Sequence, residues 1–165
     1  MSRDSAMAMM VREVKIANPS AKLLIWAHAG HVAKSSIYKS ENGGGMGGYL
    51  AKLFPNNYFV IGTSTSEGTY AVTKDRFIKR TSKMIDAKLP KAPENSIENN
   101  FAKRSAGQVT LINLMSLTND SIPMRMRIAG YDVPRKDRDQ FPGFDIKASF
   151  DLLIHIIKSN PSSYF

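Results

Sequence analysis

Short unbroken apolar runs, separated by segments with helical spacing, restrict the fold of this chain more than any other feature of its sequence. Residues 23–27 and 58–61 are two such runs, each bounded by polar residues. Strands covered on both faces have this pattern, and such strands are typically parallel. Between the runs, a polar and glycine-rich stretch precedes residues 46–54, which have apolar positions at helical spacing. Residues 22–61 therefore predict a strand, helix, strand unit with a right-handed crossover.

The remainder of the chain extends this pattern into an α/β fold. Residues 3–16 predict a helix ended by Asn18 and Pro19, with an apolar face made of Met7, Met10, Val11 and Val14. A second helix is expected over residues 96–104, with Ser96 or Asn95 as its N-cap. The polar segment 132–149 contains two prolines and predicts a long surface segment. Further candidate strands cover residues 69–72, 109–114, 124–129 and 150–157.

These segments predict one α/β domain over residues 1–165, built on a largely parallel sheet flanked by helices. The sheet is expected to contain the strands near Leu23, Tyr58, Val109 and Phe150. The flanking helices are expected near Met7, Met46 and Ile97.

Composition and charge exclude several classes of function. The chain has no cysteine, which excludes disulfides, thiolate metal sites and a cysteine nucleophile. The net charge of +9 makes nucleic acid a candidate partner. However, only residues 74–83 form a dense basic run, which we interpret as a solvated face, so nucleic acid is disfavoured. No secretion signal and no membrane-spanning run is recognised, so no membrane partner is expected and a cytoplasmic location is the default.

The segment 26–32 carries the most informative polar residues, His28 and His31, directly after an apolar run. Ligands in open α/β sheets bind beyond the carboxyl ends of strands, and a histidine there can serve as a general acid or base. Convergence of the two rings requires a turn or helical start at Ala29 and Gly30. Two imidazoles could also bind zinc, but further ligands are not adjacent in sequence. Ordinary loop histidines are the remaining alternative.

Other motifs point less directly to chemistry. The glycines from 43 to 48 match a dinucleotide fingerprint only formally, and we expect them to allow close packing of the helix that follows. Residues 62–68 lack the nucleophile elbow of a serine hydrolase. Glu67 is placed by the expected parallel sheet at the same edge as His28, where it could orient an imidazole or accept a substrate hydroxyl. His155 lies within an apolar run and is expected to be structural, donating to a backbone carbonyl.

The ordered set of motifs resembles the erythromycin esterase family over nearly the whole chain. The opening blocks are Arg3-Asp4 with Met7-Ala8, Trp26-Ala27-His28 with His31-Val32, Met46-Gly47 with Leu50, Tyr58 through Ile61-Gly62, and Glu67-Gly68. Later blocks are Ser96-Ile97-Glu98, Met124-Arg125, Gly130 through Asp132, and Phe150-Asp151. The family usually has asparagine where this chain has Met10 and Ala29.

The resemblance implies hydrolysis of an ester, in the best-known members a macrolide lactone, by water that histidine and carboxylate activate without a serine nucleophile. It assigns proton transfer or oxyanion contact to His28 and His31, support to Glu67, and bracing to Arg3 and Asp4. No cofactor and no metal is implied, and the partner is a small-molecule ester.

The resemblance covers only the C-terminal half of the family's domain. Members carry an upstream half that adds a Glu and a His motif to the same cleft. The chain is therefore expected to be an incomplete half that self-associates or needs a missing N-terminal half. The alternative is a non-catalytic binding or pseudoenzyme domain.

Overall fold

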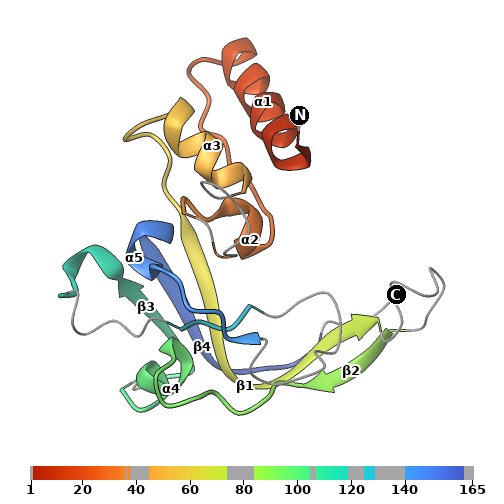
Figure 1. The fold of residues 1–165 in the computed structure, drawn as a ribbon, viewed down its shortest axis with the longest axis vertical. Helices are drawn as coiled ribbons and strands as arrows, with labels where there is room; N and C mark the ends of the chain where they lie inside the picture. Colours follow the sequence, from red (N-terminus) through yellow and green to blue (C-terminus); the bar gives the residue numbers. More distant parts are fainter. Residues whose placement is uncertain are drawn as a thin grey trace.

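The computed structural model describes residues 2–35, 37, 45–73, 84–104, 107–118, 125–128 and 140–161. These residues form an α/β fold in which helices flank an open four-stranded sheet (Figure 1). The helices are α1 (Arg3–Ala17), α2 (Ala29–Val32), α3 (Met46–Leu53), α4 (Ile97–Ala102), η1 (Leu114–Ser116) and α5 (Ile146–Ser149). The strands are β1 (Ile61–Thr73), β2 (Met84–Lys88), β3 (Val109–Asn113) and β4 (Leu152–Ser159).

The sheet has the strand order β2-β1-β4-β3 and is mixed rather than wholly parallel. Only the central strands β1 and β4 run parallel, with Ile61 opposite Leu152 and Ser64 opposite His155. The edge strands β2 and β3 pair antiparallel with β1 and β4. Helices and a mixed open sheet confirm the α/β class. The expectation of a largely parallel sheet is corrected, because only β1 and β4 pair in parallel.

The two faces of the sheet differ because side chains alternate along each strand. On the inner face, Leu153 and His155 are fully buried, and Leu153 joins the main core, which includes Phe150, Ile97 and Leu114. On the outer face, which carries Ile61, Val109 and Leu111, these apolar side chains are 48–67% exposed. The part of the chain that the structure describes thus covers the sheet on one face only.

Helices α1, α2 and α3 form a separate group at the end of the sheet where β1 begins (Figure 1). A second core, made of Ala8, Met46 and Leu50, holds α1 against α3. Helix α1 starts at Ser2, whose hydroxyl accepts the N–H of Ser5 at 3.2 Å. None of the helices in the described ranges is long and apolar enough to span a bilayer.

The predicted helices are confirmed, although their buried faces differ from the expected ones. The helix over residues 3–16 corresponds to α1, which buries Ala8 and packs Met7 and Val11, whereas Met10 and Val14 are exposed. The helix over residues 96–104 corresponds to α4, and Ser96 is its N-cap.

The glycine-rich segment also packs as expected where the structure describes it. Gly47 lies so close to α2 that a Cβ atom there would come within 2.1 Å of the Val32 carbonyl oxygen. This close approach explains why the first turn of α3 is rich in glycine.

Residues 23–27 do not form the buried strand that their apolar run predicts. They have no regular secondary structure and leave Leu24 92% and Trp26 93% exposed. The predicted strand, helix, strand unit is therefore wrong, because its first strand is missing from the sheet. The second run gives only the start of β1, which continues through residues 69–72 to Thr73.

The later predictions are confirmed in part. Strands at 109–114 and 150–157 correspond to β3 and β4. Residues 125–128 contribute isolated bridges at Arg125 rather than a strand, and residues 124 and 129 lie outside the described ranges. Within the predicted surface segment, Phe141 and Ile146 are buried, so that prediction is wrong for residues 140–149. The basic run 74–83 and residues 132–139 are not among the described residues.

Candidate functional site

The first turn of α1 and the short helix α2 bring Arg3, Asp4 and His31 together. The Nδ1 atom of His31 lies 2.6 Å from Oδ1 of Asp4, and its Nε2 atom lies 3.0 Å from Nη2 of Arg3. Asp4 also accepts the backbone N–H of Met46 at 3.2 Å. One carboxylate thus joins the starts of α1 and α3 to the histidine on α2.

The partners of His31 determine which ring nitrogen carries the proton. A guanidinium group has only donors, so Nε2 accepts from Arg3. In the neutral ring, Nδ1 then carries the hydrogen and donates it to Asp4. Carboxylate contact at Nδ1 and a basic lone pair at Nε2 is the arrangement of an oriented general base.

His28 is the N-cap of α2, and its Nδ1 atom accepts the N–H of Gly30 at 3.2 Å. The helical start that convergence of the two histidines required is therefore present at Ala29 and Gly30. Because Nδ1 is an acceptor, the neutral His28 ring carries its hydrogen on Nε2. This nitrogen is a hydrogen-bond donor, which suits contact with a carbonyl oxygen or an oxyanion.

His28 lines a pocket of about 570 Å³ that runs along β1 from its first residues towards the end of β4. The wall has apolar residues, which include Ile25, Trp26 and Ile61, and a set of hydroxyl-bearing residues. The hydroxyl-bearing lining residues are Thr63, Ser64, Thr65, Thr69, Tyr70 and Ser159. His31 is not among the lining residues, so within the described structure the two histidines do not face one pocket.

Two interactions hold α2 against the start of the sheet. The Tyr58 hydroxyl donates to the carbonyl oxygen of Val32 at 2.6 Å, and burial, with the nearby Asp151 carboxylate, raises the pKa of Tyr58 to about 12. Lys34 forms an ion pair of 2.6 Å with Asp151, which precedes β4. The two histidines are thus placed at the amino end of β1 and β4, not at the carboxyl end that the sequence predicts.

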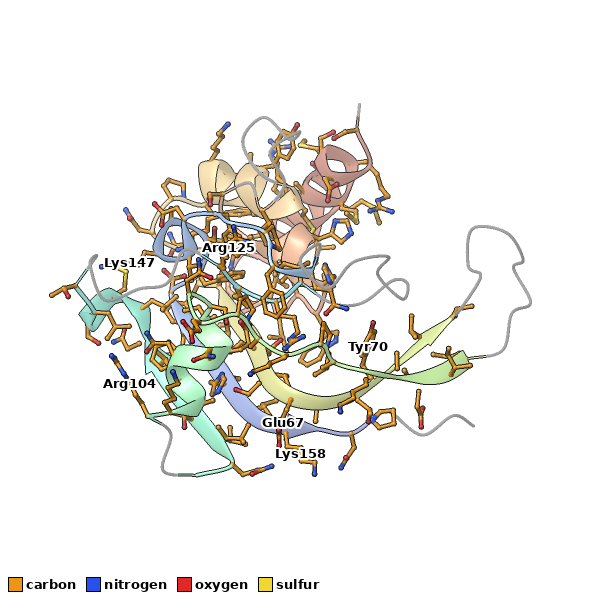
Figure 2. All side chains as sticks on the ribbon, turned by 60° about the horizontal axis from the view of Figure 1, so that its bottom comes forward. Glu67, Tyr70, Arg104, Arg125, Lys147 and Lys158 are labelled. Carbon is orange, nitrogen blue, oxygen red and sulfur yellow. The ribbon has the colours of Figure 1, made fainter. Side chains whose placement is uncertain are left out.

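Glu67 lies apart from this group of residues. It is exposed in the middle of β1, in register with Lys158 of β4, and Figure 2 shows both away from α1, α2 and α3. Glu67 lines a different pocket from His28, together with Lys88 and Lys91. The geometry does not bring Glu67 to His28 or His31.

His155 is buried, as expected of a structural histidine, but its partners are serines. Its Nδ1 lies 2.8 Å from the hydroxyl of Ser64 and its Nε2 lies 3.0 Å from the hydroxyl of Ser66. Ser66 donates its single hydrogen to the carbonyl oxygen of Glu98 at 2.9 Å, so Nε2 donates to Ser66 and Nδ1 accepts from Ser64. Desolvation lowers the pKa of His155.

Sequence reasoning missed a buried polar pair next to this network. Glu98 is fully buried, and its Oε1 atom accepts the backbone N–H of Arg127 at 2.9 Å. Burial raises the pKa of Glu98, opposed by the hydrogen bond and the charge of Arg127. The Arg127 guanidinium donates to the carbonyl oxygens of Thr65, Ser66 and Pro90 and lies 4.6 Å from the Phe141 ring centre. Single charged residues usually predict surface positions, so the sequence did not indicate that this pair is buried.

A metal centre gains no support from the described residues. They contain no group of three or more histidine, aspartate or glutamate residues close enough to hold an ion. The His31 ring nitrogens are both engaged by Arg3 and Asp4.

Comparison with known proteins gives one family and several similar folds. A family model described as erythromycin esterase matches residues 1–159. No curated protein matches the chain significantly. A solved Bacillus cereus protein matches with a TM-score of 0.79 and 22% identity, over 96% of this chain and 38% of the solved chain.

Two further solved structures have the same fold. A protein described as a succinoglycan biosynthesis protein matches with a TM-score of 0.75 and 22% identity, over 96% of this chain and 38% of its own. A variant of the erythromycin esterase EreC in its open conformation matches with a TM-score of 0.71 and 19% identity, over 94% of this chain and 36% of its own. The chain therefore spans well under half the length of each of these proteins.

Proposed function

The chain belongs to the erythromycin esterase family, and from this premise we propose that it is part of a hydrolase that cleaves an ester or a macrolactone with histidine-activated water. In this proposal His31 takes the proton of the attacking water. His28 donates a hydrogen bond to the carbonyl oxygen of the same substrate, which requires the pocket beside His28 to extend to His31 once Arg3 has moved away. Arg3 and Asp4 position His31.

The Asp4–His31 contact of 2.6 Å is the observation that carries the proposal. A carboxylate at Nδ1 fixes the tautomer that leaves Nε2 basic, and it stabilises the imidazolium that forms when the ring takes a proton. Arg3 occupies Nε2 and is exposed, so its side chain can exchange with water or substrate. Attack then requires Arg3 to move from Nε2.

The pocket beside His28 supports a substrate that is partly apolar and partly hydroxylated. Its apolar wall suits burial of a hydrocarbon surface, and its row of hydroxyl groups can pair with hydroxyls of the substrate. The Nε2–H of His28 would stabilise negative charge that develops on the ester oxygen.

The test is hydrolysis of p-nitrophenyl butyrate by the chain supplied with the unmatched part of a relative, compared between the unaltered chain and the variants His31→Gln and His28→Ala. Loss of a general base is expected to lower kcat by roughly 100-fold or more. Glu67→Gln is the matched control, since Glu67 is exposed and lines another pocket. Unchanged turnover in both histidine variants would refute the proposal, whereas loss in Glu67→Gln alone would restore the role that the sequence suggested for Glu67.

The uncovered outer face of the sheet supports a requirement for further polypeptide. Apolar residues are exposed on this face, and the solved relatives contain more than half of their length outside the matched region. Contiguous exposed apolar surface marks an interaction site or a cause of self-association. In this proposal the face is covered by polypeptide corresponding to that unmatched part, and the chain on its own associates with itself. Its exposed apolar residues are Ile61, Val109 and Leu111, and its half-buried ones are Leu152, Ile154 and Ile156.

A non-catalytic binding domain is the second candidate, and one observation favours it. Both ring nitrogens of His31 are engaged within the chain, which leaves the ring without a lone pair for water in this conformation. Binding of a substrate without turnover, even after the unmatched part of a relative is added, would select this candidate.

A further inference from the structure

We propose that a second pocket, between the middle of β1, the segment 88–92 and α4, binds a small polyhydroxylated anion such as a sugar phosphate or a sugar acid. The pocket has a volume of about 610 Å³, enough for one such molecule. Neither His28 nor His31 of the proposed active site lines it. The lining residues are Ser66, Glu67, Lys88, Leu89, Pro90, Lys91, Ala92, Glu98, Asn99, Ala102 and Lys103.

The charges of the pocket favour an anion. Lys88, Lys91 and Lys103 line it and are exposed, so their ammonium groups remain hydrated and charged. Glu67 is the exposed carboxylate of the lining. Ammonium groups are common partners of phosphate and carboxylate.

The floor of the pocket requires donors from its ligand. Glu98 is fully buried, and its Oε2 atom accepts no hydrogen bond. The Oδ1 atom of the neighbouring Asn99 is also buried without a partner, while its Nδ2 donates to the carbonyl oxygen of Ala92 at 3.4 Å. Buried acceptors without donors are rare in folded proteins, and ligand hydroxyls would supply the missing hydrogens. An inorganic anion offers charge but few donors.

The exposed lysines of the pocket and its buried acceptors without hydrogen-bond donors together indicate the class of ligand. A neutral sugar would satisfy the acceptors but not use the lysines, and a simple phosphate would pair with the lysines but not satisfy the acceptors. A hydroxylated anion matches both sets. Ser66, which is the link to His155, adds a hydroxyl at the same pocket.

Isothermal titration of the full chain with glucose 1-phosphate and with glucuronate tests this site and separates phosphate from carboxylate ligands. Glucose and inorganic phosphate provide the matched half-ligands. Saturable one-site binding of at least one of the two hydroxylated anions, roughly tenfold tighter than that of either half-ligand, is expected.

The double variant Lys91→Ala/Lys103→Ala should weaken that binding about tenfold or more, because it removes two charges of the pocket. Lys22→Ala/Lys52→Ala is the control, because both lysines are exposed and lie outside this pocket. Equal weakening in both double variants would mean general attraction to a basic protein and would overturn the proposal. Inorganic phosphate binding as tightly as the hydroxylated anions, or no saturation with either of them, would overturn it as well. Circular dichroism of each variant confirms that the fold is retained.

Discussion

Lys34 and Asp151 form an ion pair of 2.6 Å between Nζ and Oδ1, which links the residues after α2 to the start of β4. The other carboxylate oxygen of Asp151 accepts the N–H of Val60 at 2.7 Å, one residue before β1. Both side chains are less than one third exposed. One carboxylate therefore fixes the position of the histidine segment relative to the two central strands.

Replacement of Asp151 should consequently destabilise the fold. Asp151→Ala is expected to lower the free energy of unfolding by about 1.5–3 kcal/mol, since it leaves Val60 N–H and Lys34 without their acceptor. Asp151→Asn keeps an acceptor for Val60 and should cost less. Urea unfolding at pH 7 measures the effect, and a change below about 0.5 kcal/mol in Asp151→Ala would contradict this role.

Asp4 should act on turnover through the orientation of His31. Asp4→Asn replaces an acceptor with a group that can donate to Nδ1, which favours the wrong tautomer of the ring. By analogy with triad carboxylates, kcat for an ester substrate should fall by roughly 100-fold or more while KM changes little. Asp86→Asn, on the edge strand β2, is the control. If both variants retain full kcat, Asp4 does not position a general base.

His155 predicts a pH dependence of stability. Its pKa is lowered in the folded chain, so the unfolded chain binds a proton more readily as the pH falls. The contribution of His155 to the free energy of unfolding is fully present above its pKa in the unfolded chain, about 6.5. It is lost as the pH falls below that value and through the lower pKa of the folded chain.

Urea unfolding at pH 8 and at pH 5 measures this effect. The difference in unfolding free energy between the two pH values should be larger in the unaltered chain than in His155→Gln, which cannot titrate. Since His28 and His31 are present in both proteins, the comparison isolates His155. Equal differences would show that His155 does not contribute.

Gly47 should tolerate no side chain. A Cβ atom there would lie 2.1 Å from the Val32 carbonyl oxygen and 2.4 Å from that of Ala33, and both are backbone atoms that cannot turn away. Gly47→Ala is therefore expected to cost about 1–3 kcal/mol by overpacking. Gly107→Ala is the matched control, because nothing lies within 4 Å of its Cβ position. Thermal unfolding of both variants provides the measurement, and equal midpoints would contradict the close contact of α2 and α3.

The success and failure of the sequence predictions have physical causes. Helical spacing located α1 and α3 because each helix buries one face in its local neighbourhood, and the N-cap signal at Ser96 located α4. The prediction of a buried strand over residues 23–27 failed because an apolar run indicates that its side chains favour burial, but not which element would bury them. Leu24 and Trp26 are instead exposed in this chain. Strand direction depends on pairings between distant residues, so the antiparallel edges β2 and β3 could not be read from local patterns.

The same distinction applies to the candidate site. The residues alone marked His28 and His31, but the contact of His31 with Asp4 spans 27 positions, and only the family resemblance had assigned Asp4 to the site. Glu67 was assigned to the site through an expected strand that does not form, and it lies elsewhere. The buried Glu98 and Arg127 had no local signal, since their burial depends on how α4 meets residues 125–128.

The outer face of the sheet leads to a prediction about self-association. Leu111 is 67% exposed on β3, and Ile61 and Val109 extend the same apolar surface. Water in contact with this surface is unfavourable, so two copies of the chain are expected to bury it against each other. Light scattering coupled to size exclusion should therefore give a mass that rises with protein concentration, and Leu111→Lys should shift the chain towards the monomer. Met10→Lys introduces the same charge at an exposed methionine of α1, 68% exposed and off the sheet, and should leave the association unchanged. A chain that is monomeric at all concentrations, or an equal effect of both lysines, would show that the outer face is not the surface of association.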